Sequence, residues 1–400
     1  MSNISFLEKL LDGADVEWKA LGDVTNVLRG KRLTKSQLSD GEKFPVYHGG
    51  LEPLGNYAES NRPANTVMII NVGASAGTVG YSSVDFWSSD GCFCLEHNEL
   101  VNNRFLYFVL IGHQNLLQSR VRVASIPTLD AIVVEKLQIP IPCPEDPEKS
   151  LEIQAEIVRI LDTFTELTTE LTTELTARKK QYNYYRDQLL SFEEGEVEWK
   201  TLPEMALDFG RGKSKHRPRN DNRLYGGDIP FIQTGDIRNA SHIISQYSQT
   251  YSEVGLKQSK LWSKGTLCIT IAANIAETSI LGFDACFPDS VIGFVADPKK
   301  TSAGYVEYLL QSTKKELEEK GREKSSAQSN INLATFKQLK LPFPSPVEQA
   351  RIVAILDKFD ALTSSLTEGL PHEIELRQKQ YEYYRDLLLS FPKPDVEVAA

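Results

Sequence analysis

The chain has 400 residues and a formal net charge of −10, with 41% hydrophobic and 24% charged residues. Its length predicts two or more domains, and its composition excludes a largely disordered chain. No apolar run approaches the roughly 18 residues that cross a bilayer, so we expect no membrane partner.

The first residues and the cysteines both indicate the cytoplasm. Glu8 and Asp12 lie where a signal peptide would carry basic residues. The cysteines include no C-x-x-C pair, so neither a disulfide framework nor a zinc site is predicted; they are Cys92, Cys94, Cys143, Cys268 and Cys286. We therefore expect a reduced, cytoplasmic protein without a bound metal.

The acidic residues are concentrated in two segments. Residues 145–196 hold 13 acids and 6 bases, and residues 346–400 hold 10 acids and 6 bases. The remainder of the chain is close to neutral and carries local basic clusters. The negative total therefore does not exclude a nucleic-acid partner.

The chain repeats itself in order. The repeated pairs are VEWKAL and VEWKTL (16–21 and 197–202), QAEIVRILDTF and QARIVAILDKF (154–164 and 349–359), and KQYNYYRDQLLSF and KQYEYYRDLLLSF (180–192 and 379–391). Val396 to Val398 begin the first motif again, so the end of the second unit resembles the start of the first. We expect two similar units in a cyclic, pseudo-symmetric arrangement.

Each unit combines a long variable part with a nearly identical helical part. The variable parts are predicted to be mixed α/β domains, with short strands at 67–72 and 267–271 and helices at 105–118 and 305–320. Residues 151–195 and 346–392 are predicted to be two long helices, each with the apolar seam of a coiled coil. Gly369-Leu370-Pro371 should kink or break the second one.

Apolar residues at coiled-coil spacing define the expected seam between the spacer helices. In the first spacer these are Ile157, Phe164, Leu167, Leu171, Leu175, Tyr182 and Leu189. In the second they are Ile352, Phe359, Leu362, Leu366, Tyr381 and Leu388. Their role is structural: they hold the distance between the two variable parts of the chain.

A basic cluster follows the VEWK motif in both units. The first cluster contains Arg29, Lys31, Arg32 and Lys35, and the second contains Arg211, Lys213, Lys215, Arg217, Arg219 and Arg223. Lysine and arginine neutralise phosphates, and arginine can bind guanine through two hydrogen bonds. Because the clusters occupy equivalent places in two repeats, DNA contact is favoured over a solvated loop.

Polar residues in the expected loops are further candidates for contacts to bases, since side-chain amides can read adenine. They are His48, Ser75, Gln233, Thr234, Asn274, Gln328 and Asn330. For each of them, ordinary hydrogen bonding within a loop is the alternative.

Two segments of the sequence suggest an enzymatic function. Gly212-Lys213-Ser214 suggests a phosphate-binding loop, but Leu207 stands where the first glycine is needed. The signature of a metal-dependent nuclease is approximated by Asp289, Asp297 and Lys299. Pro298, however, would interrupt the strand that such a site requires. Neither the cofactor loop nor the Asn/Asp-Pro-Pro-aromatic element of an adenine methyltransferase is found.

The ordered motifs resemble the specificity subunit of Type I restriction–modification enzymes. The resemblance is carried by the segments 226–237 (GGDIPFIQTGDI), 331–333 (INL), 341–344 (LPFP) and 348–353 (EQARIV), and it covers nearly all of the chain. In the first unit, FPVYHGG at 44–50 departs from the usual pattern.

The resemblance implies a non-catalytic subunit that binds double-stranded DNA at a target with two half-sites. Residues 1–150 and 196–345 would be its target recognition domains, and residues 393–400 a tail that closes the cyclic repeat. Residues 151–195 and 346–392 would be its spacers, which pair into an antiparallel coiled coil. Two methyltransferase subunits and the restriction subunits would be its partners. S-adenosylmethionine, ATP and magnesium would bind only to those partners. A scaffold that binds no DNA is the remaining alternative.

The first spacer contains TELT three times, at 165–176. Four residues lengthen a helix by roughly 6 Å and rotate it by a net angle near 40°, close to the turn of about 35° made by one base pair. The resemblance implies that such repeats set the length of the unread DNA between the half-sites. Each TELT unit is therefore predicted to add one base pair.

Overall fold

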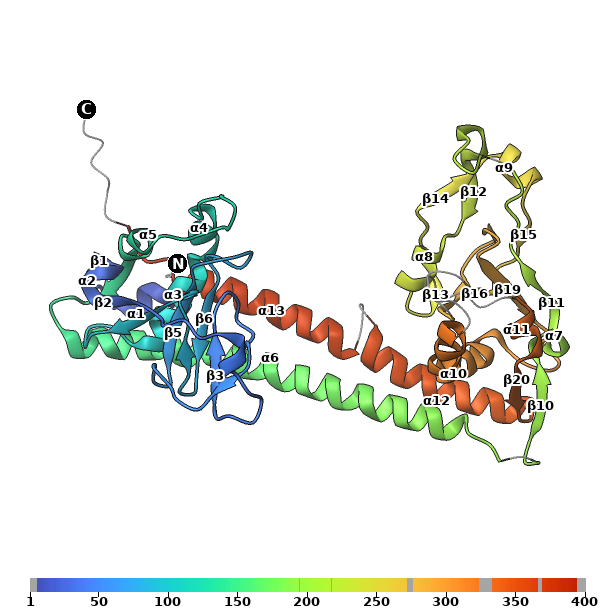
Figure 1. Ribbon diagram of the computed structural model, residues 1–400, viewed down its shortest axis with the longest axis horizontal. Coiled ribbons are helices and arrows are strands. Elements are labelled where there is room, and N and C mark those ends of the chain that lie inside the picture. Colours follow the sequence, from blue (N-terminus) through green and yellow to red (C-terminus); the bar gives the residue numbers. More distant parts are fainter. Residues whose placement is uncertain are drawn as a thin grey trace. The chain divides into compact units, whose positions relative to one another are not determined.

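The computed structural model describes residues 6–193, 195–216, 218–271, 276–323, 333–365 and 369–393, without the side chains of 320–323. The chain forms two compact units (Figure 1). The first comprises Met1–Glu170 with Glu375–Ala400, and the second comprises Leu171–Ile374. No helix among the described residues is long and apolar enough to cross a membrane.

The first unit is built on an antiparallel sheet of β2, β8, β5 and β6 (Thr25–Arg29, Cys92–His97, Thr66–Ile70, Val79–Ser82). A smaller sheet contains β4, β3 and β7 (Asn56–Tyr57, Phe44–Tyr47, Trp87–Ser88). Its short helices are α1, α2, α3, α4 and α5 (Phe6–Leu11, Leu21–Val24, Asn103–Gly112, Gln114–Ser119, Ala131–Glu135). Successive side chains of β5 point to opposite faces of the sheet. Val67 and Ile69 therefore belong to the main core, whereas Met68 packs with Phe86 and Cys94 on the other face.

The second unit repeats this plan. Its larger sheet has the order β11, β19, β16, β17 and β13 (Ala206–Arg211, Val291–Ala296, Leu267–Thr270, Thr278–Leu281, Ile243–Ile244). Its smaller sheet has the order β14, β12, β18 and β15 (Gln249–Tyr251, Tyr225–Phe231, Ala285–Cys286, Leu261–Trp262). Its short helices are α7, α8, α9 and α11 (Leu202–Met205, Thr234–Asn239, Glu253–Lys257, Leu333–Gln338), and α10 (Ala303–Glu323) is longer.

The VEWK motifs form equivalent strands. β1 (Val16–Ala20) pairs with β9 (Gln138–Pro142), and β10 (Glu198–Thr201) pairs with β20 (Lys340–Phe343). Trp18 Nε1 donates a hydrogen bond to the carbonyl of Pro392, 2.8 Å away. The segment that follows α13 (Gly369–Leu388) is thus fastened to the first strand, as the cyclic repeat requires.

The expected spacers are helical. The first is one helix, α6 (Pro147–Leu189), and the second is divided into α12 (Pro346–Ser364) and α13 (Gly369–Leu388). In the first unit Phe164 stacks on Tyr384, and in the second Tyr185 stacks on Phe359. The partner residue number falls as the α6 number rises, so the pairing is antiparallel. The predicted interruption lies just before Gly369.

The seam of α12 differs in part from the expected one. Ile352 is buried, but Leu362 is 37% exposed and Thr363 is buried in its place. Because α12 ends at Ser364, Leu362 no longer has a following helical turn to hold the seam. Leu366 lies outside the described residues.

A buried glutamine joins each domain to its spacer helix. Gln154 donates to the carbonyl of Leu100 and accepts from the amide of Asn102, at 3.0 and 2.7 Å. Gln349, its repeat equivalent, donates to the carbonyls of Lys300 and Pro344 and accepts from Thr301 Oγ1. The shared QA-x-IV sequence therefore encodes a shared attachment.

The repeated aspartate of the same motif has a different partner in each unit. Asp162 pairs with Arg104 at 2.7 Å, whereas Asp357 accepts a hydrogen bond of 2.6 Å from the hydroxyl of Tyr308. The repeated spacer residue thus contacts a side chain supplied by each variable domain. The expected helix at 105–118 is divided at His113 into α3 and α4.

Candidate nucleic-acid interface

The basic segment of the second unit, residues 211–223, connects β11 with β12 and is held by its neighbours. Ser259 Oγ donates to the carbonyl of Lys213 at 2.8 Å, and Ser252 Oγ donates to the carbonyl of Arg223 at 2.6 Å. These contacts fix the backbone and leave the side chains of Arg211, Lys213 and Lys215 exposed.

Two acids hold other cations of this segment. Arg219 makes two hydrogen bonds to Asp289, at 2.9 and 3.0 Å. Asp221 is contacted by Arg223 and by His216, each at 2.7 Å, and the hydrogen bonds from Arg223 hold the pKa of Asp221 far below its usual value. Arg219 remains 52% exposed, so a phosphate could replace Asp289 as its partner.

The basic cluster of the first unit is smaller. Arg29 ends β2 and donates to the carbonyl of Asp90 at 3.1 Å, while His48 Nδ1 lies 3.4 Å from a carboxylate oxygen of the same residue. Lys31, Arg32 and Lys35 are exposed in the following loop. The structure therefore brings Arg29 and His48 together at Asp90. Ser75 lies in the connection between β5 and β6.

Gln233 and Thr234 lie where β12 ends and α8 begins. The exposed side chain of Gln233 donates to Gln249 Oε1 at 2.5 Å. These residues follow β12, whereas the basic segment precedes it, and the strand bulges in between because Tyr225 and Ile229 both pair with Tyr251. Arg217, Asn274, Gln328 and Asn330 lie outside the described residues.

Sequence reasoning missed the side chains that other strands contribute. Lys260 Nζ lies 3.5 Å from the ring centroid of Trp262 and 2.5 Å from Asp208. Phe231 stacks on Tyr251 with ring centroids 3.9 Å apart. No local pattern marks the Lys260–Asp208 and Phe231–Tyr251 contacts, since the partners are 52 and 20 positions apart in the sequence.

The residues of the nuclease interpretation are not assembled into a site. Asp289 precedes β19 and is held by Arg219, whereas Asp297 follows β19 and lies 3.3 Å from Lys300. In the described part of the chain, no three His, Cys, Asp or Glu side chains are grouped to hold a metal ion. The described cysteines are free, and burial raises the pKa of Cys94.

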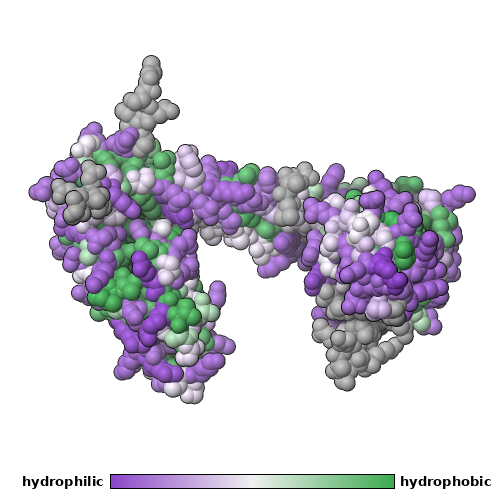
Figure 2. All heavy atoms as spheres, turned by 90° about the horizontal axis from the view of Figure 1, so that it is seen from above, coloured by the Kyte–Doolittle hydropathy of each residue, from purple (hydrophilic) through white to green (hydrophobic). Residues whose placement is uncertain are grey.

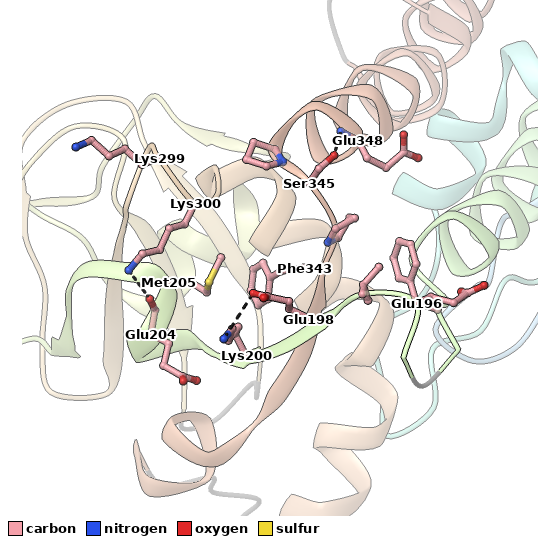
Figure 3. Close-up of a pocket in the computed structure, with 14 residues that line it drawn as sticks. Glu196, Glu198, Lys200, Glu204, Met205, Lys299, Lys300, Phe343, Ser345 and Glu348 are labelled. Carbon is pink, nitrogen blue, oxygen red and sulfur yellow. Dashed lines mark hydrogen bonds and ion pairs between the residues drawn. The ribbon is translucent and has the colours of Figure 1, made fainter.

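A pocket of about 1020 Å³ lies in the second unit where β10 and β20 meet the start of α12 (Figure 3). Lys200 lies 3.5 Å from Glu198, and Lys300 Nζ donates to the carbonyl of Glu204. Figure 1 shows these strands beside α12 and α9 at the other end of this unit. Because two of its lysines already have partners and the basic segment lies beside α9, the pocket is separate from the candidate interface.

The family model of the Type I restriction modification DNA specificity domain matches residues 14–179 and 197–376. The chain belongs to this family. It is 38% identical to the EcoR124I/EcoR124II specificity subunit of Escherichia coli, with 99% of both chains covered. It is 34% identical to a putative type I specificity subunit of Haemophilus influenzae, covering 98% of this chain and 99% of the relative.

Solved structures support the same fold. A Type I S subunit from M. genitalium matches with a TM-score of 0.59 and 16% identity, covering 96% of this chain and 98% of that one. A chain from a structure on complex assembly and conformational transition of the type I R-M system matches with a TM-score of 0.63 and 16% identity, covering 94% and 97%. The predicted family and mixed α/β fold are thus confirmed.

Membership also confirms the predicted class of function. The relatives are named as specificity subunits, so this chain recognises DNA sequence and is not itself the catalyst. The nuclease interpretation has no support among the relatives, and a scaffold without DNA binding does not fit a DNA specificity domain.

Proposed function

We propose that this specificity subunit recognises a bipartite DNA target, with one half-site read by each unit. Residues 1–150 and 196–345 would be the target recognition domains, and residues 151–195 and 346–392 the spacers that set their separation. The observation that carries this proposal is a repeated fold with different surfaces. Both units share the sheet plan and the glutamine attachment, yet their exposed basic and polar residues differ.

The basic segments are proposed to bind the phosphates beside each half-site. Lys213 and Lys215 are exposed on a backbone that Ser259 helps to fix. Each lost phosphate contact should reduce the salt slope of binding by about 0.9. Replacing both lysines with alanine should therefore lower affinity and reduce that slope by nearly 2.

The assay is fluorescence anisotropy of the complex on duplex DNA between low and moderate salt. Lys358→Ala, which removes an exposed lysine from α12, is the control and should leave the slope unchanged. An unchanged slope for Lys213→Ala/Lys215→Ala would show that this segment is only a solvated loop. Base specificity at the second half-site, measured on randomised duplexes, then separates phosphate contacts from base contacts.

We further propose that the spacers bind two copies of one methyltransferase subunit, and that restriction subunits join this assembly. Support comes from a surface that occurs twice with the same exposed residues. It consists of Lys180, Tyr184 and Asp187 on α6 and of Lys379, Tyr383 and Asp386 on α13. Identical surfaces favour identical partners, whereas the differing domain surfaces favour different DNA half-sites.

The outer tyrosines are the expected anchors. Tyr184 is 61% exposed and Tyr383 is 65% exposed. Each packs edge-on against the next tyrosine, with ring centroids 5.4 Å apart, and that tyrosine stacks on a phenylalanine of the opposite helix. Figure 2 shows a largely hydrophilic surface along the helices with scattered apolar residues. Exposed tyrosines on such a surface are typical hot spots of protein interfaces.

The charge of the spacers favours protein over DNA as the partner of these tyrosines, because both spacer segments are acidic and would repel phosphates. Native mass spectrometry of the co-expressed complex tests the assignment. Tyr184→Ala or Tyr383→Ala should each remove one methyltransferase copy, and the double variant should remove both. The control is Val347→Ala, at an 81% exposed position of α12. Two retained copies in the double variant would refute the docking surface.

S-adenosylmethionine, ATP and magnesium are proposed to act on the partner subunits. Equilibrium dialysis of the purified subunit with labelled S-adenosylmethionine should detect no binding until the methyltransferase is added. Saturable binding to the subunit alone would contradict this.

A further inference from the structure

His242 lies in the segment of the second unit that carries two of the predicted base contacts. This recognition segment, residues 233–244, begins at Gln233 and Thr234, passes through α8 and ends in β13. The amide of Ile280 in β17 donates to the carbonyl of His242 at 2.9 Å. The sheet therefore fixes the backbone of the recognition segment at this point.

The side chain of His242 contacts α10. Its Nδ1 lies 2.5 Å from a carboxylate oxygen of Glu307, which is fully buried. The imidazole ring also stacks on Tyr308, with ring centroids 5.9 Å apart and an angle of 18° between the ring planes. Two successive residues of one helix therefore hold the ring, one through its nitrogen atom and the other through its face.

The helix α10 is itself attached to the second spacer. The hydroxyl of Tyr308 donates to Asp357 of α12 at 2.6 Å, and just before α10 the carbonyl of Lys300 accepts from the buried Gln349. Helix α10 thus lies between the recognition segment and the spacer helix (Figure 1). The contacts of Glu307 and Tyr308 form a continuous path of side chains from α12 to the recognition segment.

The fold shared by the two units does not require an acid at this place. Helix α3 of the first unit is the counterpart of α10, since each follows a residue that caps the amide three positions later, Asn102 and Ser302. Five positions after that cap, the first unit has Tyr107 where the second has Glu307. A buried carboxylate loses its hydration, and buried ion pairs can often be replaced by apolar residues without loss of stability. The shared fold therefore does not explain Glu307, whereas its contact with the recognition segment does.

We infer that Glu307 is a positioning residue for DNA recognition at the second half-site. It holds His242 against α10, and His242 in turn holds the recognition segment that begins at Gln233 and Thr234. Because Glu307 is fully buried, it acts through His242 and does not touch DNA. This inference rests on the proposed bipartite function, in which the second unit reads one half-site.

The expected effect follows from the precision that base recognition needs. Side chains that bind a target must be held within about 0.5 Å of the productive geometry by the contacts behind them. Without an acceptor at Glu307, the side chain of His242 is held only by its stacking on Tyr308. Discrimination at the bases read from the recognition segment should then fall about tenfold, which corresponds to one well-placed base contact.

Two substitutions of Glu307 distinguish positioning from a general structural role. Leucine removes the acceptor for His242 in a side chain of similar size, whereas glutamine keeps an acceptor oxygen. In the methyltransferase complex, Glu307→Leu should relax the second half-site about tenfold and leave the first half-site unchanged. Glu307→Gln should keep nearly wild-type recognition. Glu319→Leu, at an exposed position of α10, is the matched control and should change neither half-site.

The readouts are methylome sequencing of cells that express each variant with its methyltransferase, and thermal unfolding of the purified complexes. An unchanged second half-site in a folded Glu307→Leu complex would overturn the inference. Equal relaxation of both half-sites would overturn it as well, since that result indicates a general loss of assembly. A Glu307→Gln variant as relaxed as Glu307→Leu would show that the contact with His242 is not the cause.

If Glu307→Leu fails to fold, His242→Phe decides. Phenylalanine can still stack on Tyr308 but offers no nitrogen to Glu307, so the second half-site should relax in the same way. An unchanged second half-site in this variant would overturn the inference. A wild-type complex that methylates no bipartite site would refute the proposed function instead.

Discussion

Replacing Gln349 with methionine should weaken the attachment of the second domain to α12. Gln349 is 3% exposed, and its amide donates to the carbonyls of Pro344 and Lys300 at 2.8 and 3.0 Å. Methionine keeps the volume but leaves both carbonyls without this donor, and Thr301 loses its acceptor. A buried polar group without a partner costs about 1–3 kcal/mol.

The hydroxyl of Thr301 can rotate toward another acceptor. The loss of stability therefore comes mainly from the carbonyls of Lys300 and Pro344, which lose their donor. Allowing about 1 kcal/mol for the added apolar burial, we expect a net loss of about 2–3 kcal/mol in the free energy of unfolding. For a unit of this size, each kcal/mol lowers the midpoint by about 2–4 °C. The melting temperature should therefore fall by roughly 5–10 °C.

Differential scanning calorimetry of the methyltransferase complex measures this effect. Gln188→Met, at an exposed position of α6, is the matched control and should shift the midpoint by about 1 °C or less. The reasoning is refuted if Gln349→Met unfolds at the same temperature as that control. Gln154→Met should reproduce the loss in the first unit.

Stability of the second unit should decrease as the pH rises, because contact with Glu307 raises the pKa of His242 and burial raises the pKa of Glu307. Both groups hold their proton more tightly in the folded chain, so the His242 contribution is complete below about pH 6.5 and is lost above it. Melting curves from pH 6 to 9 should show this decline, and Glu307→Gln should flatten it; an equal slope in that variant would contradict the assignment. The isolated subunit should aggregate because its spacer tyrosines, including Tyr184 and Tyr383, are exposed without a partner. A monodisperse subunit on size-exclusion chromatography, without a gain in melting temperature on adding methyltransferase, would argue against this.

Much of the architecture could be predicted because the repeats occupy structural positions. The two VEWK motifs form equivalent strands. The two QA-x-IV motifs place the buried Gln154 and Gln349, which attach each domain to its spacer helix. Gly369-Leu370-Pro371 indicated the interruption of the second spacer, since glycine and proline oppose helix continuation. The apolar seam of α12 was less predictable. Near the end of this helix Thr363 is buried where Leu362 was expected, and Leu362 is exposed instead.

The candidate interface could be predicted only as groups of charges. The sequence marks Arg219 as one of a run of cations, but its partner Asp289 lies 70 positions away and is brought near by the sheet. Asp90 joins Arg29 and His48 for the same reason. Such pairings depend on strand order and register, which local patterns do not contain.

The central claim is that one chain reads two half-sites separated by unread DNA. Its most direct test is single-molecule sequencing of DNA from cells that express this subunit with its methyltransferase, in a host without other adenine methylation. We expect one motif with two specified halves, a spacer of fixed length and a methylated adenine in each half. A continuous motif, a spacer of variable length or methylation that does not require this subunit would contradict the account.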